Sequence, residues 1–145
     1  MHVAVQSGPF DAGALIAACG AGDPAVGAVA GFTGIVRGGG GLGAMEIEHY
    51  PGMTEAAIAR FAEEAKARFS LIDVAVVHRH GRLEVGETIM AVACAAPHRA
   101  DAFAAAEFLM DWLKSRAPFW KKEIGPDGAS WVAAKDEDED ALARW

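Results

Sequence analysis

Cationic and imidazole side chains gather around one long helical pattern in a chain whose overall charge is negative. Arginine can clamp a phosphate through paired hydrogen bonds, and a lysine removed from water can pass protons near neutral pH. Such a set suits an anionic small molecule, and it needs neither a nucleophilic cysteine nor a metal. The side chains concerned are Arg37, His98, Arg99, Lys114, Lys121 and Lys122.

Lys114 draws attention because it lies in the last turn of that helical pattern. At about 100° per residue, Phe103, Met110 and Lys114 align along one side, and Ala106 and Leu113 widen the line into an apolar stripe. We expect this stripe to face the core and to leave Lys114 partly desolvated. The alternative is that Lys114 only satisfies the carbonyl end of the helix.

A second apolar side of the same helix carries Phe108 and Trp112. A helix that is apolar on two sides is usually buried on two sides. The second partner is either another subunit or the tail of the same chain, packing over Trp112.

Lys121 and Lys122 lie in an expected strand after Pro118, where successive side chains point to opposite faces. Lys121 shares a face with Phe119 and Glu123, so only one of the two lysines can face a given pocket.

Three other motifs are weaker. The run Gly38–Gly43 lacks the lysine and hydroxyl residues of a P-loop and indicates a flexible loop. His78 and His80 share one face of an expected strand but have no third ligand at suitable spacing, which favours a surface or hydrogen-bonded pair. Cys94 lies in an apolar strand and is expected to be inert. We therefore expect no metal and no cofactor.

Composition narrows the class of protein. With 145 residues, 52% hydrophobic residues and a net charge of −7, the chain is expected to form one globular domain over 1–145 that does not bind nucleic acid. No apolar run reaches the roughly 18 residues needed to span a bilayer, and no signal peptide is evident. Cys19 and Cys94 do not make a disulfide framework. A cytoplasmic location is expected.

The expected elements alternate along the chain and predict a mixed α+β fold. Asp11 and Thr54 are expected to cap helices, and Pro118 must end the long one. Strands are expected at 3–6, 26–37, 44–50, 72–80, 86–95, 119–124 and 129–133, and helices at 11–19, 54–69, 98–117 and 136–145.

Five segments together resemble the large, catalytic subunit of molybdopterin synthase, in that family's order and spacing from Asp23 to Trp145. They are G-A-V-A-G-F-T-G-I-V-R, E-H-Y-P-G-M-T, H-R-H-G-R-L-E-V-G-E, A-P-H-R-A-D-A-F and D-W-L-K-S-R-A-P-F-W-K-K-E. The resemblance implies an α/β hammerhead-type domain with an additional antiparallel β-sheet. It also implies a sulfurtransferase of molybdenum cofactor biosynthesis, which inserts two dithiolene sulfurs into cyclic pyranopterin monophosphate to give molybdopterin.

The partners that the resemblance implies are a second copy of the chain and two small ubiquitin-like sulfur carriers, together a heterotetramer. Each carrier would deliver sulfur as a thiocarboxylate on its C-terminal Gly-Gly tail. The absence of a reactive cysteine fits this arrangement, because the sulfur arrives on the partner.

Site residues follow from the same resemblance, position by position. Lys114 and Lys121 match two catalytic lysines, and His98 with Arg99 matches a pair that binds the anionic end of the substrate, from the same subunit or across the dimer. The remaining expected substrate-binding residues are Ile35, Val36, Arg37, Lys122 and Glu123. The chain departs from relatives at Gly38–Gly41, where they carry polar residues, and at Lys135, where they often carry arginine. A competing interpretation is a non-catalytic module that binds an acidic or ubiquitin-like C-terminal tail.

Overall fold

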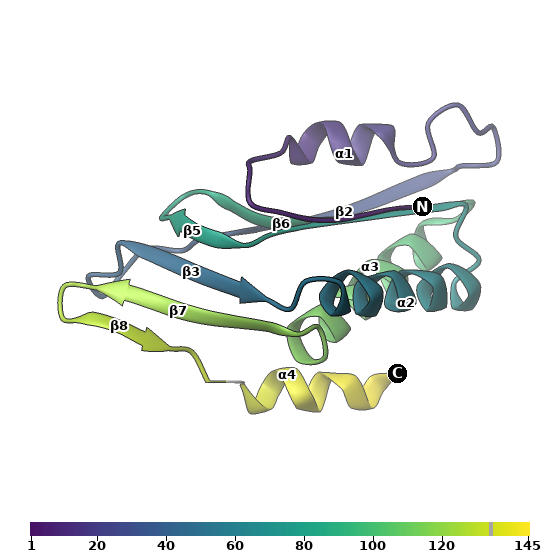
Figure 1. The fold of residues 1–145 in the computed structure, drawn as a ribbon. Coiled ribbons are helices and arrows are strands. Elements are labelled where there is room, and N and C mark those ends of the chain that lie inside the picture. Colours follow the sequence, from purple (N-terminus) through teal and green to yellow (C-terminus); the bar gives the residue numbers. More distant parts are fainter. Residues whose placement is uncertain (134) are drawn as a thin grey trace.

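Two four-stranded β-sheets and four α-helices make up the computed structural model, which describes residues 1–133 and 135–145 (Figure 1). The strand orders are β1-β4-β6-β2 in one sheet and β5-β3-β7-β8 in the other. The elements are β1 (His2–Gln6), α1 (Ala12–Ala18), β2 (Ala28–Ile35), β3 (Ala44–His49), α2 (Met53–Arg68), β4 (Asp73–Arg79), β5 (Gly81–Glu84), β6 (Thr88–Ala96), α3 (Arg99–Ser115), β7 (Phe119–Gly125), β8 (Gly128–Trp131), α4 (Asp136–Ala141) and a final 3₁₀ turn η1 (Leu142–Arg144).

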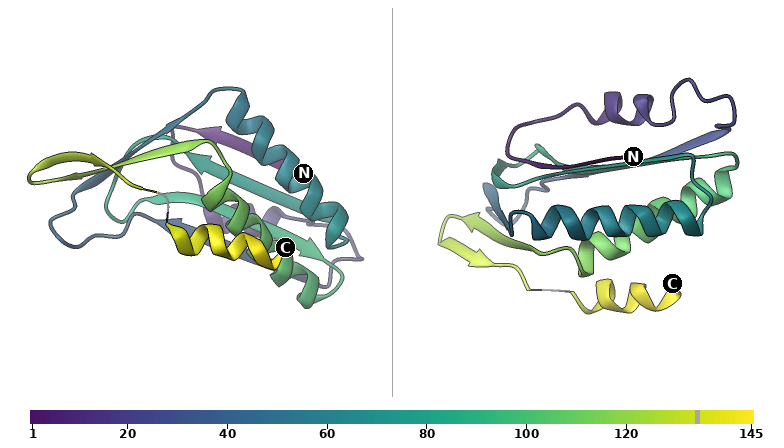
Figure 2. Two further views of the ribbon diagram at one scale, coloured as in Figure 1. Left: turned by 90° about the horizontal axis from the view of Figure 1, so that it is seen from below. Right: turned by 45° about the vertical axis from the view of Figure 1, so that its right-hand side comes forward.

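The first sheet is mixed, since β1 pairs with β4 in parallel and the other neighbours are antiparallel. Helix α1 covers one face, and α2 and α3 cover the other (Figure 2). Side chains alternate across the strands, so Val74 and Val92 pack with α2 and α3 while Ala75 and Ala93 pack beneath α1. Because both faces are covered, the central strands β4 and β6 are buried nearly throughout.

The second sheet is antiparallel throughout, and its β7–β8 hairpin extends beyond the body of the molecule (Figure 2). Val36, Ile47 and Leu83 form a small separate core beneath it. The expected α+β class with an additional antiparallel sheet is therefore confirmed.

Most expected elements are present, and two details differ. Gly81, with φ +92°, reverses the chain after β4, and the short strand β5 forms between the expected strands 72–80 and 86–95, where no element was expected. Thr54 does not cap α2: Gly52 is the cap, and Glu55 accepts from its N–H at 2.7 Å. The buried Thr54 hydroxyl instead accepts from the Tyr50 N–H at 2.9 Å and donates to the Pro118 carbonyl at 3.0 Å, which ties α2 to the start of β7.

The expected orientation of α3 is wrong. Phe103 is 67% exposed, whereas Ala102, Ala105 and Phe108 are buried. Small alanines let the helix approach the first sheet closely, and this fixes the buried face. Trp112 stacks on Phe61 of α2 at 5.3 Å, so it packs within its own chain.

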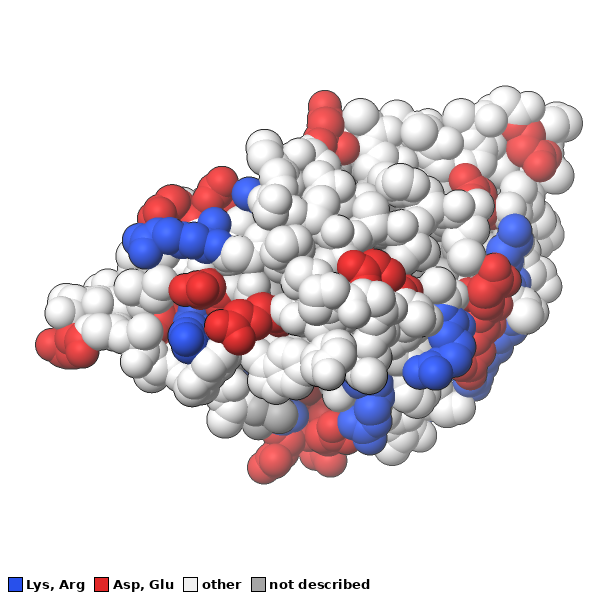
Figure 3. Space-filling model, viewed as in Figure 1, with Lys and Arg blue, Asp and Glu red and all other residues white. Residues whose placement is uncertain are grey.

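The C-terminal tail returns along α3. The Trp145 ring meets Phe108 edge-on at 5.5 Å, and its Nε1 donates to Asp111 at 2.6 Å. Arg116 pairs with Glu139, and Arg144 pairs with Asp111 at 3.0 Å. Acidic side chains gather over α4, next to basic ones, at the lower edge of the space-filling view (Figure 3). No described helix is both long and apolar enough to cross a bilayer.

Candidate active site

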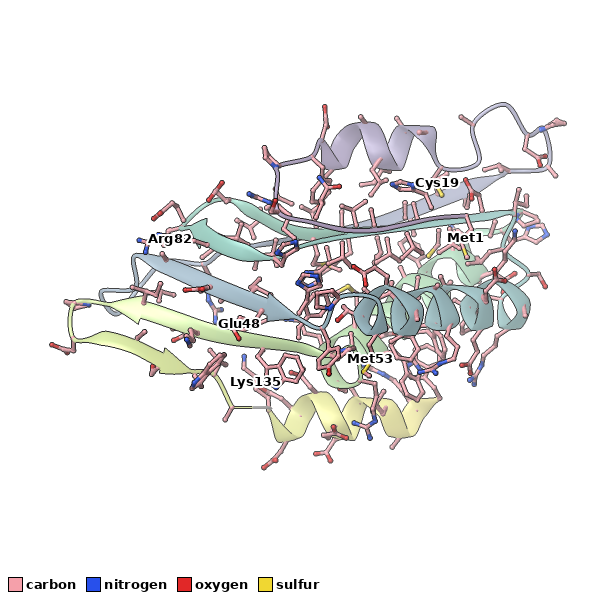
Figure 4. All side chains as sticks on the ribbon, in the orientation of Figure 1. Met1, Cys19, Glu48, Met53, Arg82 and Lys135 are labelled. Carbon is pink, nitrogen blue, oxygen red and sulfur yellow. The ribbon has the colours of Figure 1, made fainter. Side chains whose placement is uncertain are left out.

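A cleft of about 1380 Å³ opens between the end of α3, the β7–β8 hairpin, the glycine loop after β2 and the segment that leads into α4. Lys135 belongs to that last segment and lies between α4 and the β7–β8 hairpin (Figure 4). Four cationic residues contribute to the lining: Arg37, Lys114, Lys121 and Lys135. Four acidic residues line it as well: Glu123, Asp127, Glu137 and Asp138. The lining is therefore of mixed charge, and an anion would be attracted only where the cations gather.

Strand β7 decides which lysine reaches the cleft. Its antiparallel pairing with β3 sets Lys121 opposite Ile47 and Lys122 opposite Glu46. Lys121 lines the cleft, whereas Lys122 has its Nζ 3.8 Å from the Glu48 carboxylate and 4.3 Å from the centre of the Trp131 ring. Only one of the two lysines faces the cleft, as the alternation along the strand predicts, and Lys122 does not line it.

Lys121 is the perturbed base of the cleft. Its pKa is lowered from 10.5 to about 8, chiefly by burial and next by the charge of the neighbouring Lys114. Among the described residues, no carboxylate lies within 4.0 Å of its ammonium. A lysine with such a pKa holds a proton at pH 7 but can release it at little cost.

Lys114 lines the same cleft but is exposed, so the expected desolvation of Lys114 is wrong. The reason is the rotation of α3, which turns the side of Phe103 to solvent and keeps Leu113 in the core. Lys114 acts on the cleft as a neighbouring cation, and the desolvated lysine is Lys121.

The other expected substrate residues are distributed unevenly. Arg37, Ile35 and Glu123 line the cleft, and all three are exposed. Val36 does not: its side chain is 1% exposed, in the small core, and its N–H and C=O are bonded to Glu87 and Gly86 at 2.9 and 2.8 Å. Val36 therefore does not line this cleft. Side chains alternate between the two faces at the end of β2, so Ile35 and Arg37 point toward the cleft while Val36 points into the small core.

His98 and Arg99 lie at the opposite end of α3 and are exposed. Arg99 begins the helix and Lys114 comes fifteen residues later, which at 1.5 Å per residue places them about 22 Å apart along the axis. Within one chain, the His-Arg pair does not line the cleft.

Sequence reasoning missed His78 as a cleft residue. His78 is 4% exposed, lines the cleft and stacks on Phe119 with ring centroids 3.8 Å apart. His80, expected to pair with it, stacks instead on His49 at 4.1 Å. The apolar context of β4 was the available signal that His78 is buried, but only the tertiary fold brings it to β7.

Comparisons with known proteins agree on one family. The family described as "MoaE protein" matches residues 5–116. A molybdopterin synthase catalytic subunit from Cereibacter sphaeroides is 63% identical, with all of both chains covered. The solved molybdopterin biosynthesis MoaE protein of Burkholderia ambifaria superposes with a TM-score of 0.85 at 53% identity, covering 99% of this chain and 97% of that one. Molybdopterin synthase from Staphylococcus aureus gives 0.82 at 30% identity, covering 89% and 95%.

Proposed function

This chain belongs to the MoaE protein family, and we propose that the cleft holding Lys114 and Lys121 carries out the sulfur insertion of a molybdopterin synthase catalytic subunit. The substrate is cyclic pyranopterin monophosphate, the product is the dithiolene of molybdopterin, and the context is molybdenum cofactor biosynthesis. One observation carries the assignment of roles: Lys121, with a pKa of about 8, lies beside Lys114 in a cleft that also holds Arg37.

The sulfur donor is the thiocarboxylate at the C-terminal Gly-Gly of a small ubiquitin-like subunit. Its sulfur attacks a side-chain carbon of the substrate, and water then cleaves the acyl–sulfur bond, which leaves the sulfur on the substrate and a carboxylate on the carrier. An oxygen leaving group needs a proton in the first step, and the attacking water must lose one in the second. A lysine populated in both forms near pH 7 can serve both steps.

The two lysines then have different roles. Lys121 carries protons, because burial has brought its pKa near the working pH. Lys114 keeps that pKa low through repulsion and holds the incoming thiocarboxylate as an exposed cation. Arg37 contributes a bidentate contact to the substrate phosphate. Lys114 and Lys121 are thus the proposed catalytic pair.

A homodimer completes the site in this proposal, with one small subunit bound to each copy. Support comes from an apolar hollow of about 410 Å³ beside the edge strand β2, lined in part by the exposed rings of Phe32 and Phe103. Exposed apolar surface of this kind indicates a subunit contact. His98 and Arg99, too distant in one chain, would reach the cleft of the second copy and bind the anionic end of the substrate there.

We also place the enzyme in the cytoplasm. The two cysteines of the chain, Cys19 and Cys94, are buried and free, as is usual in a reducing compartment. Cell fractionation tests this: recovery with cytosolic markers is expected, and recovery with periplasmic markers would contradict it.

The function is tested by incubating the purified chain with thiocarboxylated small subunit and cyclic pyranopterin monophosphate. Formation of the dithiolene, followed by its oxidised fluorescent derivative, is expected. A non-catalytic module for acidic tails would bind the small subunit and form no dithiolene, and that result would overturn the proposal.

A further inference from the structure

His78, on β4 of the first sheet, forms part of the wall of the cleft. Its ring lies nearly parallel to that of Phe119, at an interplanar angle of 19°. Phe119 and Lys121 are two residues apart on β7 and therefore lie on the same face of that strand. The stacking consequently brings the His78 ring next to the position of the Lys121 side chain.

The hydrogen bond of His78 fixes which nitrogen carries the proton. Its Nδ1 lies 2.7 Å from the backbone carbonyl oxygen of Arg79. A carbonyl oxygen can only accept, so Nδ1 donates. Burial lowers the pKa of His78 to about 3, and so the ring is neutral under physiological conditions. A neutral imidazole has one N–H, which leaves Nε2 as an acceptor.

The titratable groups that act on His78 are all basic. Lys121 of β7, Lys114 of α3 and His49 of β3 each disfavour a positive charge on its ring. No described side chain donates to Nε2. His78 is therefore a neutral acceptor set among donors, and the flexible stem of Lys121 allows its ammonium to reach an acceptor at this position.

We propose that His78 is a positioning residue of the active site, whose Nε2 accepts a hydrogen bond from the Lys121 ammonium and directs it toward Lys114 and the cleft. This inference rests on the proposed function for its catalytic meaning. The hydrogen bond itself is independent of that function. Because an ammonium is a stronger hydrogen-bond donor than a neutral amine, the acceptor favours the charged form of Lys121 and limits how far burial can lower its pKa.

Two amide substitutions separate positioning from a structural role. In His78→Gln, an amide oxygen can take the place of Nε2, whereas the bond to the Arg79 carbonyl is lost. In His78→Asn, the shorter amide can replace the Nδ1 donor and leaves no acceptor facing Lys121. His78→Phe keeps the ring and its stacking on Phe119 but removes the acceptor, so it controls for poor packing in the amide variants.

The decisive measurement is the pKa of Lys121 by NMR of ¹³Cε-labelled lysine, with the five lysines of the chain assigned by single Lys→Arg changes. This readout needs neither substrate nor partner, so its failure is distinguishable from failure of the proposed function. We expect the Lys121 pKa to fall by about half a pH unit or more in His78→Asn and His78→Phe, and to stay within about 0.3 in His78→Gln. An unchanged pKa in His78→Phe would overturn the proposal.

Turnover gives the second readout. With the substrate at saturation, kcat should fall about tenfold in His78→Asn and His78→Phe and little in His78→Gln, while KM stays close to the wild-type value in all three. A purely structural role, in which His78 holds the Arg79 carbonyl, gives the opposite order, with His78→Asn more active than His78→Gln. That order would refute positioning.

Discussion

Replacing Lys121 by methionine should stabilise the fold while removing activity. Methionine keeps the buried aliphatic stem but not the charge. The lysine pKa of about 8 in the folded chain, against 10.5 as its ordinary value, corresponds to roughly 3 kcal/mol at about 1.4 kcal/mol per pH unit. Because solvent still reaches part of the side chain, we expect Lys121→Met to gain about 2 kcal/mol in unfolding free energy at pH 7.

The sign of the pH dependence follows from proton binding. Below pH 8, Lys121 is protonated in both the folded and the unfolded chain, so the folded wild type carries the full free-energy cost of burying the charged lysine. Between pH 8 and 10.5, the unfolded chain binds more protons, and the stability of the wild type therefore rises with pH. The advantage of Lys121→Met should shrink over this interval and vanish above it.

Urea unfolding of both proteins at pH 7 and pH 10 measures this directly. The matched control is Lys122→Met, which removes an ion pair of 3.8 Å with Glu48 and a contact with Trp131, and which should lose up to about 1 kcal/mol at pH 7. The reasoning is refuted if Lys121→Met is no more stable than the wild type at pH 7, or if its advantage is undiminished at pH 10.

Three further predictions concern the surroundings of the site. Trp145→Ala should lower the unfolding free energy, measured in urea, by about 3 kcal/mol, because it removes the edge-on contact with Phe108 and the indole N–H that donates to Asp111. A loss below about 1 kcal/mol would show that the tail is not packed against α3. Phe103→Glu should shift the proposed dimer toward monomer in light scattering, whereas a wild type that is monomeric at every concentration would remove the shared site. Arg99→Lys should weaken substrate binding in calorimetry despite the retained charge, because bidentate contact is lost, and unchanged affinity would exclude Arg99 from the phosphate site.

Local patterns in the sequence were sufficient for most elements. Asp11 accepts from the Ala14 N–H at 2.9 Å, as its capping position before a short helix predicts. The alternation along β7 assigned Lys121 and Lys122 to opposite faces, and the structure agrees. Such features depend on neighbours within a few residues, which a sequence displays directly.

The side of α3 that faces the first sheet could not be predicted from neighbouring residues. Two apolar sides were visible, and the choice between them depended on how closely alanines let the helix approach the sheet. Because the wrong side of α3 was expected to face the core, Lys114 was expected to be buried. In the structure Lys114 is exposed, and the more buried lysine is Lys121. His78 was overlooked for a related reason, since its contact with Phe119 joins β4 to β7, forty-one residues later in the chain.

The central claim is that Lys121, held beside Lys114 in the cleft, transfers protons during sulfur insertion. Single-turnover dithiolene formation with thiocarboxylated small subunit should be compared in Lys121→Arg and Lys114→Arg, both with small-subunit binding verified. A guanidinium keeps the charge but cannot release a proton at neutral pH. We predict that Lys121→Arg loses about a hundredfold or more in rate, while Lys114→Arg, which still repels Lys121 and holds an anion, loses less. Near-normal turnover in Lys121→Arg would contradict it.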